Sequence, residues 1–177
     1  MASLDTGRVY LRNFRQEDIH DMYEFCSQPE IEMVGWSAHK NVDQTNKVLE
    51  QWMSEQSTFA IVHKRDNKVI GYIAVHEDSE EGRSDTKELG FALNSQYHRQ
   101  GLMSEVVRCV LGDLFSEDKG ISYVWACCIQ DNIPSKNLIE KIGFELVQEG
   151  VFFAASFHGE VPSYEYRMSK SDWLARN

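Results

Sequence analysis

The chain has 177 residues, of which 42% are hydrophobic and 11% aromatic, and its formal net charge is −10 at pH 7. This length predicts a single domain over residues 1–177, and the apolar content is sufficient for a packed core and argues against disorder. The acidic charge argues against nucleic acid as a partner, because phosphate binding needs clustered Lys and Arg. It serves either solubility or the attraction of cationic substrates.

Other features of the sequence argue against a membrane protein and against a metalloprotein. No apolar run approaches the roughly 20 residues of a spanning helix, and residues 1–7 lack the apolar region of a signal peptide, so we expect a cytoplasmic protein without a membrane partner. The cysteines form no C-x-x-C pair and have no histidine at a ligand spacing, so we expect buried thiols and no metal site. They are Cys26, Cys109, Cys127 and Cys128.

The first part of the chain predicts one strand and two helices. Apolar residues alternate over residues 9–11, as in a short strand, and then recur at helical spacing over residues 19–26 until Pro29 stops the helix. A second helix is expected to begin near Asp43, and the segment between the two helices is expected to be a loop that carries Trp36.

The middle of the chain predicts three strands. Phe59–Val62 and Val69–His76 are typical of strands joined by a polar hairpin connection at residues 64–68. A flexible acidic loop is expected over residues 77–85, before the next strand at Glu88–Leu93.

The last part of the chain predicts two helices and three strands. The i, i+3, i+4 rhythm from Met103 to Leu114 predicts a helix. Tyr123–Ile129 is apolar on both faces, which is typical of a strand buried on both sides, and Ser135–Ile142 predicts a short helix stopped by the glycine after it. Phe144–Phe153 and Ser163–Met168 are expected to be antiparallel strands. The fold class is therefore α/β (α+β), with a mixed, mostly antiparallel sheet of six or seven strands and helices on both faces.

The first candidate site is the turn between the strand Glu88–Leu93 and the long helix. Residues His98–Glu105 open that helix, where free backbone N–H groups and the positive end of the helix dipole gather. Such a turn can bind a phosphate or pyrophosphate, and Gly101 would let the backbone come close to the phosphate oxygens. A plain structural turn is the alternative interpretation.

The second candidate site follows the buried strand and has the sequence N-x-x-S-x-N-L-x-E-K-x-G-F over Asn132–Phe144. Ser135 can be interpreted as a helix N-cap, or as a group that gives a proton to a leaving thiolate. Asn132 also has two interpretations, because an Asp-Asn pair before a helix commonly makes a turn.

Together the two segments resemble the paired acetyl-CoA motifs of the GNAT superfamily of N-acetyltransferases. The phosphate turn of that superfamily is usually written Q/R-x-x-G-x-G/A, whereas His98 and Met103 stand at its first and last positions here. That departure points to the ribosomal-protein N-terminal acetyltransferase branch, and so do several further segments. These are Tyr10–Arg12, Gln16–Asp18, Gln28–Glu30, Phe157–Glu160 and Tyr164–Met168, so the resemblance covers almost the whole chain.

The resemblance implies acetyl-CoA as the co-substrate and assigns its contacts. The pantetheine arm would pair with backbone groups of Phe91, Ala92 and Leu93 where two strands splay apart. The pyrophosphate would lie on the amides of Arg99, Gln100, Gly101, Leu102, Met103 and Ser104. Asn132, Asn137 and Lys141 would lie along the cofactor.

The resemblance also implies a direct attack by an amine on the thioester. Ser135 would be the general acid, and Glu88 would take the amine proton through a water, with Glu77 and His76 as alternatives and a solvated strand-end charge as the plain interpretation of each. Trp36 would form a wall of the acceptor pocket, or would simply be packed.

The acceptor implied first is a protein N-terminal α-amino group. The alternatives are a small amine, such as a polyamine or an aminoglycoside, and a non-catalytic module that only binds acetyl-CoA. The absence of a G-x-G-x-x-G turn early in the sequence argues against a Rossmann reductase. Relatives often pair, so a homodimer that covers the edge of the sheet is also expected.

Overall fold

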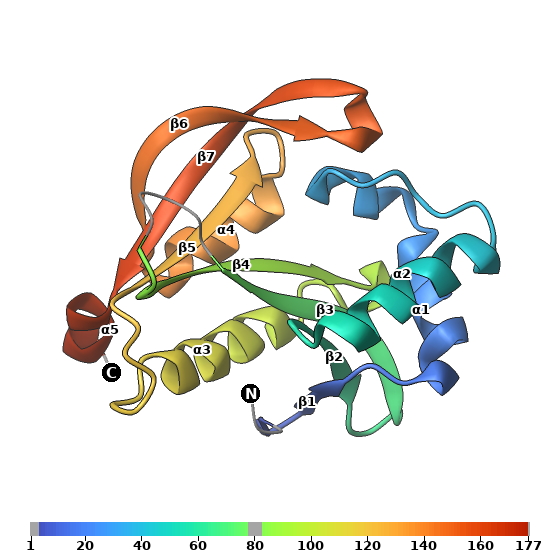
Figure 1. Cartoon of the computed structure of the whole chain (residues 1–177), viewed down its shortest axis with the longest axis horizontal. Coiled ribbons are helices and arrows are strands. Elements are labelled where there is room, and N and C mark those ends of the chain that lie inside the picture. The colour runs from blue at the N-terminus through green and yellow to red at the C-terminus, as the bar shows by residue number, and fades with distance from the viewer. Residues whose placement is uncertain (1–3, 78–82, 177) are drawn as a thin grey trace.

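The computed structural model describes residues 4–77 and 83–176, and its centre is a seven-stranded sheet in the order β1-β2-β3-β4-β5-β7-β6 (Figure 1). The β4–β5 pair is parallel and the other neighbouring pairs are antiparallel, which confirms the predicted mixed sheet. Most of the predicted acidic loop, residues 78–82, lies outside the described residues. The strands are β1 Val9–Asn13, β2 Thr58–His63, β3 Lys68–Glu77, β4 Thr86–Leu93, β5 Tyr123–Ile129, β6 Glu145–Ala154 and β7 Gly159–Ser169.

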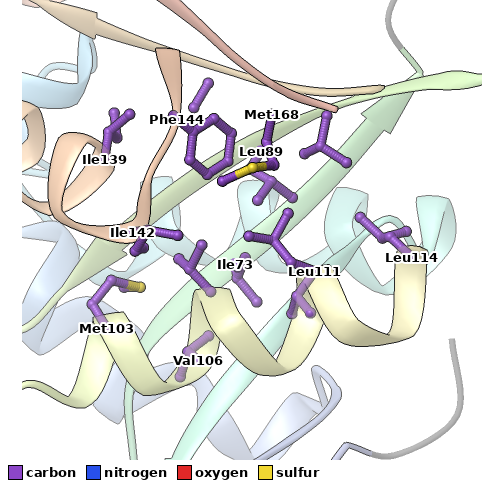
Figure 2. Close-up of a cluster of buried hydrophobic side chains, with 14 of the residues drawn as sticks. Ile73, Leu89, Met103, Val106, Leu111, Leu114, Ile139, Ile142, Phe144 and Met168 are labelled. Carbon is purple, nitrogen blue, oxygen red and sulfur yellow. The ribbon is translucent and has the colours of Figure 1, made fainter. Parts of the chain in front are cut away.

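Helices cover both faces of this sheet and enclose two apolar cores. On one face α1 (Ile19–Cys26) and α2 (Val42–Glu55) cover a cluster that includes Phe25, Trp52 and Tyr72. On the other face α3 (Leu102–Leu114) and α4 (Ile133–Ile142) pack their apolar side chains against the strands (Figure 2). Fully burying one aliphatic side chain contributes roughly 1.5–3 kcal/mol, so these two clusters hold the layers together.

The predicted strands and helices are found within a few residues of their expected positions. Helix α4 begins two residues before Ser135, because Pro134 is tolerated in a first helical turn. The expected loop before Trp36 contains a short 3-10 helix, η2 (Pro29–Val34), and the C-terminal helix α5 (Lys170–Arg176) was not predicted.

Burial differs from the expectation on one face of β5. Val124, Ala126 and Cys128 are buried, but Trp125 and Cys127 on the opposite face are partly exposed. The prediction of buried thiols is therefore wrong for Cys127, and it is wrong for the partly exposed Cys109 as well.

The feature that positions the site is a gap between β4 and β5. Their parallel pairing runs from the Thr86–Tyr123 pair to the Leu89–Ala126 pair and then stops. Beyond that point β4 remains paired only with β3, and β5 remains paired only with β7. Among the strands of the described residues, none therefore neighbours one edge of residues 90–93.

In the part of the chain that the structure describes, no helix combines the length and the apolar character needed to cross a membrane.

Candidate active site

The turn after β4 has the backbone geometry of an anion-binding helix start. Arg99 and Gly101 both adopt left-handed conformations, with φ of 60° and 76°, and Gly101 is the N-cap of α3. A Cβ on Gly101 would meet a single neighbour, Arg8 Nη2 at 3.6 Å, so the space in front of the helix start is open. The first amides of an α-helix have no partner within the helix, so those of Leu102–Ser104 can receive an anion.

Hydrogen bonds from side chains hold this turn in place, and one of these side chains is a buried asparagine. Asn94, which is 0% exposed, accepts from Gln28 Nε2 at 3.0 Å and donates to Glu24 Oε1 at 2.8 Å. His98 Nε2 donates to the carbonyl oxygen of Leu93 at 2.8 Å and thereby closes the turn. The sequence analysis missed Asn94, because an asparagine after a strand carries no local signal for such a contact with α1.

The start of the chain supports the same turn from the other side. Arg8 pairs with Glu105 (Nε to Oε2, 2.8 Å), and its Nη1 donates to the carbonyl oxygen of Gln100 at 2.8 Å. Burial would raise the pKa of Glu105, but hydrogen bonds from Thr6 and Arg8 outweigh it and lower that pKa. Glu105 therefore stays ionised and ties the segment before β1 to the first turn of α3.

The free edge of β4 continues from this turn toward the parallel pair. The amide of Asn94 donates to the Ile70 carbonyl of β3, and backbone groups alternate between the two edges of a strand. Ala92 therefore faces β3, while the backbone groups of Phe91 and Leu93 face the gap. Of the three residues predicted to pair with pantetheine, Phe91 and Leu93 have the suitable orientation.

A cavity of about 370 Å³ lies where the gap opens. Among the residues predicted for the site it is lined by Glu88, Phe91, Asn132 and Ser135. Among the described residues, Ala92, Leu93, the turn Arg99–Ser104, Asn137 and Lys141 do not line it. Asn137 and Lys141 instead lie one turn apart on an exposed face of α4.

The polar end of the cavity is formed by neighbouring strands. Glu88 on β4 lies directly opposite His76 on β3, so the two side chains share a face of the sheet. The imidazole of His76 lies beside Gly90, since a Cβ added there would be 3.7 Å from His76 Nε2, an ordinary contact distance. Burial, together with the nearby Glu88 carboxylate, raises the pKa of the Cys127 thiol to about 11, so this thiol is neutral near pH 7.

The opposite wall of the cavity is aromatic. The rings of Trp36 and Tyr72 are stacked with centroids 5.2 Å apart, and Trp52 packs on Tyr72 at 4.8 Å. Phe152 of β6 adds a further ring, which lies so close to Gly35 that a Cβ there would be 2.7 Å from it. The predicted position of Trp36 in the acceptor wall agrees with this lining, whereas Phe152 had no signal in the sequence.

Asn132, and not Ser135, is the N-cap of α4. Its Oδ1 accepts from the backbone amide of Ser135 at 3.2 Å, which makes Ser135 the third residue of the helix. The interpretation of Ser135 as the cap is therefore wrong, and its side chain lines the cavity at the helix start. The other polar atom of Asn132, Nδ2, donates to the carbonyl oxygen of Met33 at 3.0 Å.

The match to a known family explains this geometry. Residues 8–145 match the model of the acetyltransferase (GNAT) domain. The chain belongs to the GNAT family of acetyltransferases. It is similar to two proteins of Bacillus subtilis (strain 168): the uncharacterized N-acetyltransferase YnaD is 24% identical over 96% of this chain and 98% of that protein, and YoaA is 28% identical over 90% of each.

Solved structures show the same fold. A GNAT acetyltransferase from Bacillus anthracis superposes with a TM-score of 0.81, at 23% identity over 96% of this chain and 99% of that one. The structure of a putative ribosomal-protein-serine acetyltransferase from Vibrio cholerae superposes with a TM-score of 0.77. It is 17% identical over 94% of this chain and 97% of that one. Spermidine N-acetyltransferase from the same species, solved with CoA and spermine, superposes with a TM-score of 0.76. It is 12% identical over 96% of this chain and 99% of that one.

As a GNAT acetyltransferase, the chain is an acetyl-CoA-dependent enzyme, and its residues fit that co-substrate. The open helix start at Gly101 suits a pyrophosphate, and the free edge of β4 suits the amides of a pantetheine arm. The cavity then begins where a thioester at the end of that arm would lie. The open turn and the cavity are therefore two distinct features of this GNAT acetyltransferase.

Proposed function

We propose that this GNAT acetyltransferase transfers the acetyl group of acetyl-CoA to the α-amino group of a protein N-terminus, with both substrates bound together. The composition of the acceptor cavity is the observation that supports this choice. Among the described residues that line it, Glu88 is the one carboxylate, and the walls are mainly aromatic and aliphatic. Such a cavity suits one amine next to an apolar group.

The cavity argues against a polyamine. Each additional ammonium group that leaves water needs its own acidic partner, because an unpaired buried charge is expensive. A single carboxylate serves one amine. The neighbouring structure of spermidine N-acetyltransferase therefore supports the shared fold and not a shared acceptor.

We propose acetyl-CoA contacts in line with the geometry. The amides of Arg99–Ser104 hold the pyrophosphate, since Leu102 and Met103 have buried side chains and can offer only backbone groups. Phe91 and Leu93 offer backbone groups to the pantetheine arm, and Asn137 and Lys141 lie along the cofactor. When bound, acetyl-CoA supplies an activated acetyl thioester.

The residues around the cavity supply proton transfer and orientation. An α-amino group has a pKa near 8, so a fraction is neutral at pH 7 and only a modest base is required. Glu88 lies opposite His76 across the strands, and in this proposal it accepts the amine proton through a water. Ser135, at the start of α4, is placed to donate a proton to the departing thiolate, and the aromatic wall excludes water.

A panel of amines assayed with acetyl-CoA tests this proposal. We expect release of free CoA thiol with peptides that have a free N-terminus, and mass spectrometry should place the acetyl group on the α-nitrogen. The same peptides blocked at the N-terminus, but with a free lysine, are the matched control and should not react. If spermidine or an aminoglycoside is acetylated while the peptides are not, the proposed acceptor is wrong and a small amine takes its place. If acetyl-CoA binds but no amine is acetylated, the result favours a non-catalytic binding module.

A further inference from the structure

The acceptor side of the cavity depends on a short segment, residues 29–36, which we call the η2 segment. Met33, Val34 and Trp36 from this segment line the cavity. Pro29 and Gly35 bracket its 3-10 helix, and Gly35 is left-handed with φ of 93°. A single short turn therefore presents three of the side chains that an acceptor would meet.

Contacts from distant parts of the chain hold the η2 segment in place. Asn132 Nδ2 donates to the Met33 carbonyl at 3.0 Å, and Ser156 Oγ donates to the Glu32 carbonyl at 2.8 Å. Next to them, the Phe152 ring packs against Gly35 with no room for a Cβ. One attachment thus comes from the start of α4, and the others come from β6 and the turn after it.

We propose that Asn132 is a positioning residue for the acceptor: it fixes the η2 segment to the start of helix α4, so that the acceptor wall and Ser135 keep a fixed relation. This inference rests on the proposed acetyl transfer and deepens it. Asn132 is well suited to this task, because its amide has both an acceptor and a donor. Its Oδ1 binds the Ser135 amide, and its Nδ2 binds the Met33 carbonyl.

The alternative role for Asn132 is a direct contact with acetyl-CoA. In the structure, each polar atom of the amide already has a protein partner, and the partner of Nδ2 belongs to the acceptor wall. Losing that donor would loosen the η2 segment, which would then be held only by its other contacts, such as those with Ser156 and Phe152. The turn at Gly101 and the edge of β4 would be unchanged. The two roles therefore affect different substrates.

Asn132→Asp separates the roles. Aspartate caps a helix as well as asparagine does, but it has no N–H, and its carboxylate would face the Met33 carbonyl. We expect the KM for the acceptor peptide to rise about tenfold, as for the loss of one oriented hydrogen bond, while the Kd for CoA changes less than about twofold. Asn132→Ser keeps a cap without a charge, and we expect the same direction with a smaller rise.

Asn41→Asp is the matched control. Asn41 caps α2 through the Gln44 amide at 3.0 Å and is exposed, so the same substitution occurs at a helix N-cap outside the cavity lining. Its kinetic constants should equal those of the parent enzyme. A tenfold loss of CoA affinity in Asn132→Ser with an unchanged acceptor KM would overturn the inference and make Asn132 a cofactor ligand.

Hydrogen exchange tests the attachment without any turnover. We expect amides of residues 30–36 to exchange faster in both Asn132 variants than in the parent protein and in Asn41→Asp. Unchanged exchange in this segment would overturn the inference even if the enzyme is active. If the parent protein acetylates no amine at all, the proposed function fails, while faster exchange would still support the attachment.

Discussion

The cofactor side and the acceptor side of this site are built in different ways. The proposed phosphate turn uses backbone amides from one short stretch, Arg99–Ser104, in which the side chains of Leu102 and Met103 are buried in the core. The acceptor wall uses side chains from η2, β3 and β6, which the fold brings together from distant positions. In the proposed assignment the groups that contact the cofactor therefore come from one stretch, which Arg8 and Asn94 hold from outside it. The groups that would contact the acceptor come from several elements.

The largest effect is expected at Ser135, where the two sides meet. Ser135→Ala should lower kcat about 100-fold with little change in CoA affinity, because a proton donor acts mainly in the transition state. Since Asn132 is the cap of α4, the change should leave the free energy of unfolding nearly unaltered. Steady-state kinetics at saturating acetyl-CoA, calorimetry with CoA and urea unfolding measure the three quantities.

Ser135→Asp makes this test sharper. An acidic residue in a first helical turn is favourable, so the variant should be stable, but an ionised carboxylate is a poor proton donor and repels a thiolate. Near-normal turnover in both Ser135 variants would show that water or another side chain delivers the proton.

Gly101→Glu should break the cofactor side alone. The substitution forces a side chain into a left-handed position and adds a negative charge in front of the helix start. We expect CoA affinity at least tenfold weaker, a loss of ~1.4 kcal/mol or more. Calorimetry on the folded variant measures it, and an unchanged Kd would contradict the assignment of the pyrophosphate site.

A smaller effect is expected at Arg8, which supports the turn from the start of the chain. Arg8→Gln removes the pair with Glu105 and should weaken CoA binding by at most about fivefold, because an exposed ion pair contributes ~0.2–1 kcal/mol. Binding of pantetheine, which has no phosphate, should not change. Arg65→Gln removes an equal charge from the exposed turn between β2 and β3 and should leave both affinities as they are. If Arg8→Gln weakened pantetheine binding equally, Arg8 would not act through the phosphate turn.

The sequence predicted what is encoded locally. The seven strands, α1 to α4 and the glycine turn follow from apolar spacing and from residues that end helices, such as Pro29 and Gly143. Asn94, Phe152 and the Asn132–Met33 hydrogen bond did not follow, because each depends on residues that are neighbours only after folding. The interpretation of Ser135 as a cap is wrong for a local reason: Pro134 is tolerated in the first turn, so the helix begins at Ile133 with Asn132 as its cap, and Ser135 stands three residues after that cap.

The place of β7 between β5 and β6 also affects how the enzyme matures on the ribosome. Strand β5 has its second neighbour only after residues 159–169 have been made, and Ser156, which holds the η2 segment, precedes them by a few positions. Domains generally fold as units, and synthesis proceeds at ~5–20 residues per second. The single sheet therefore cannot be completed until β7 has been made, and we expect a shorter nascent chain to hold neither substrate.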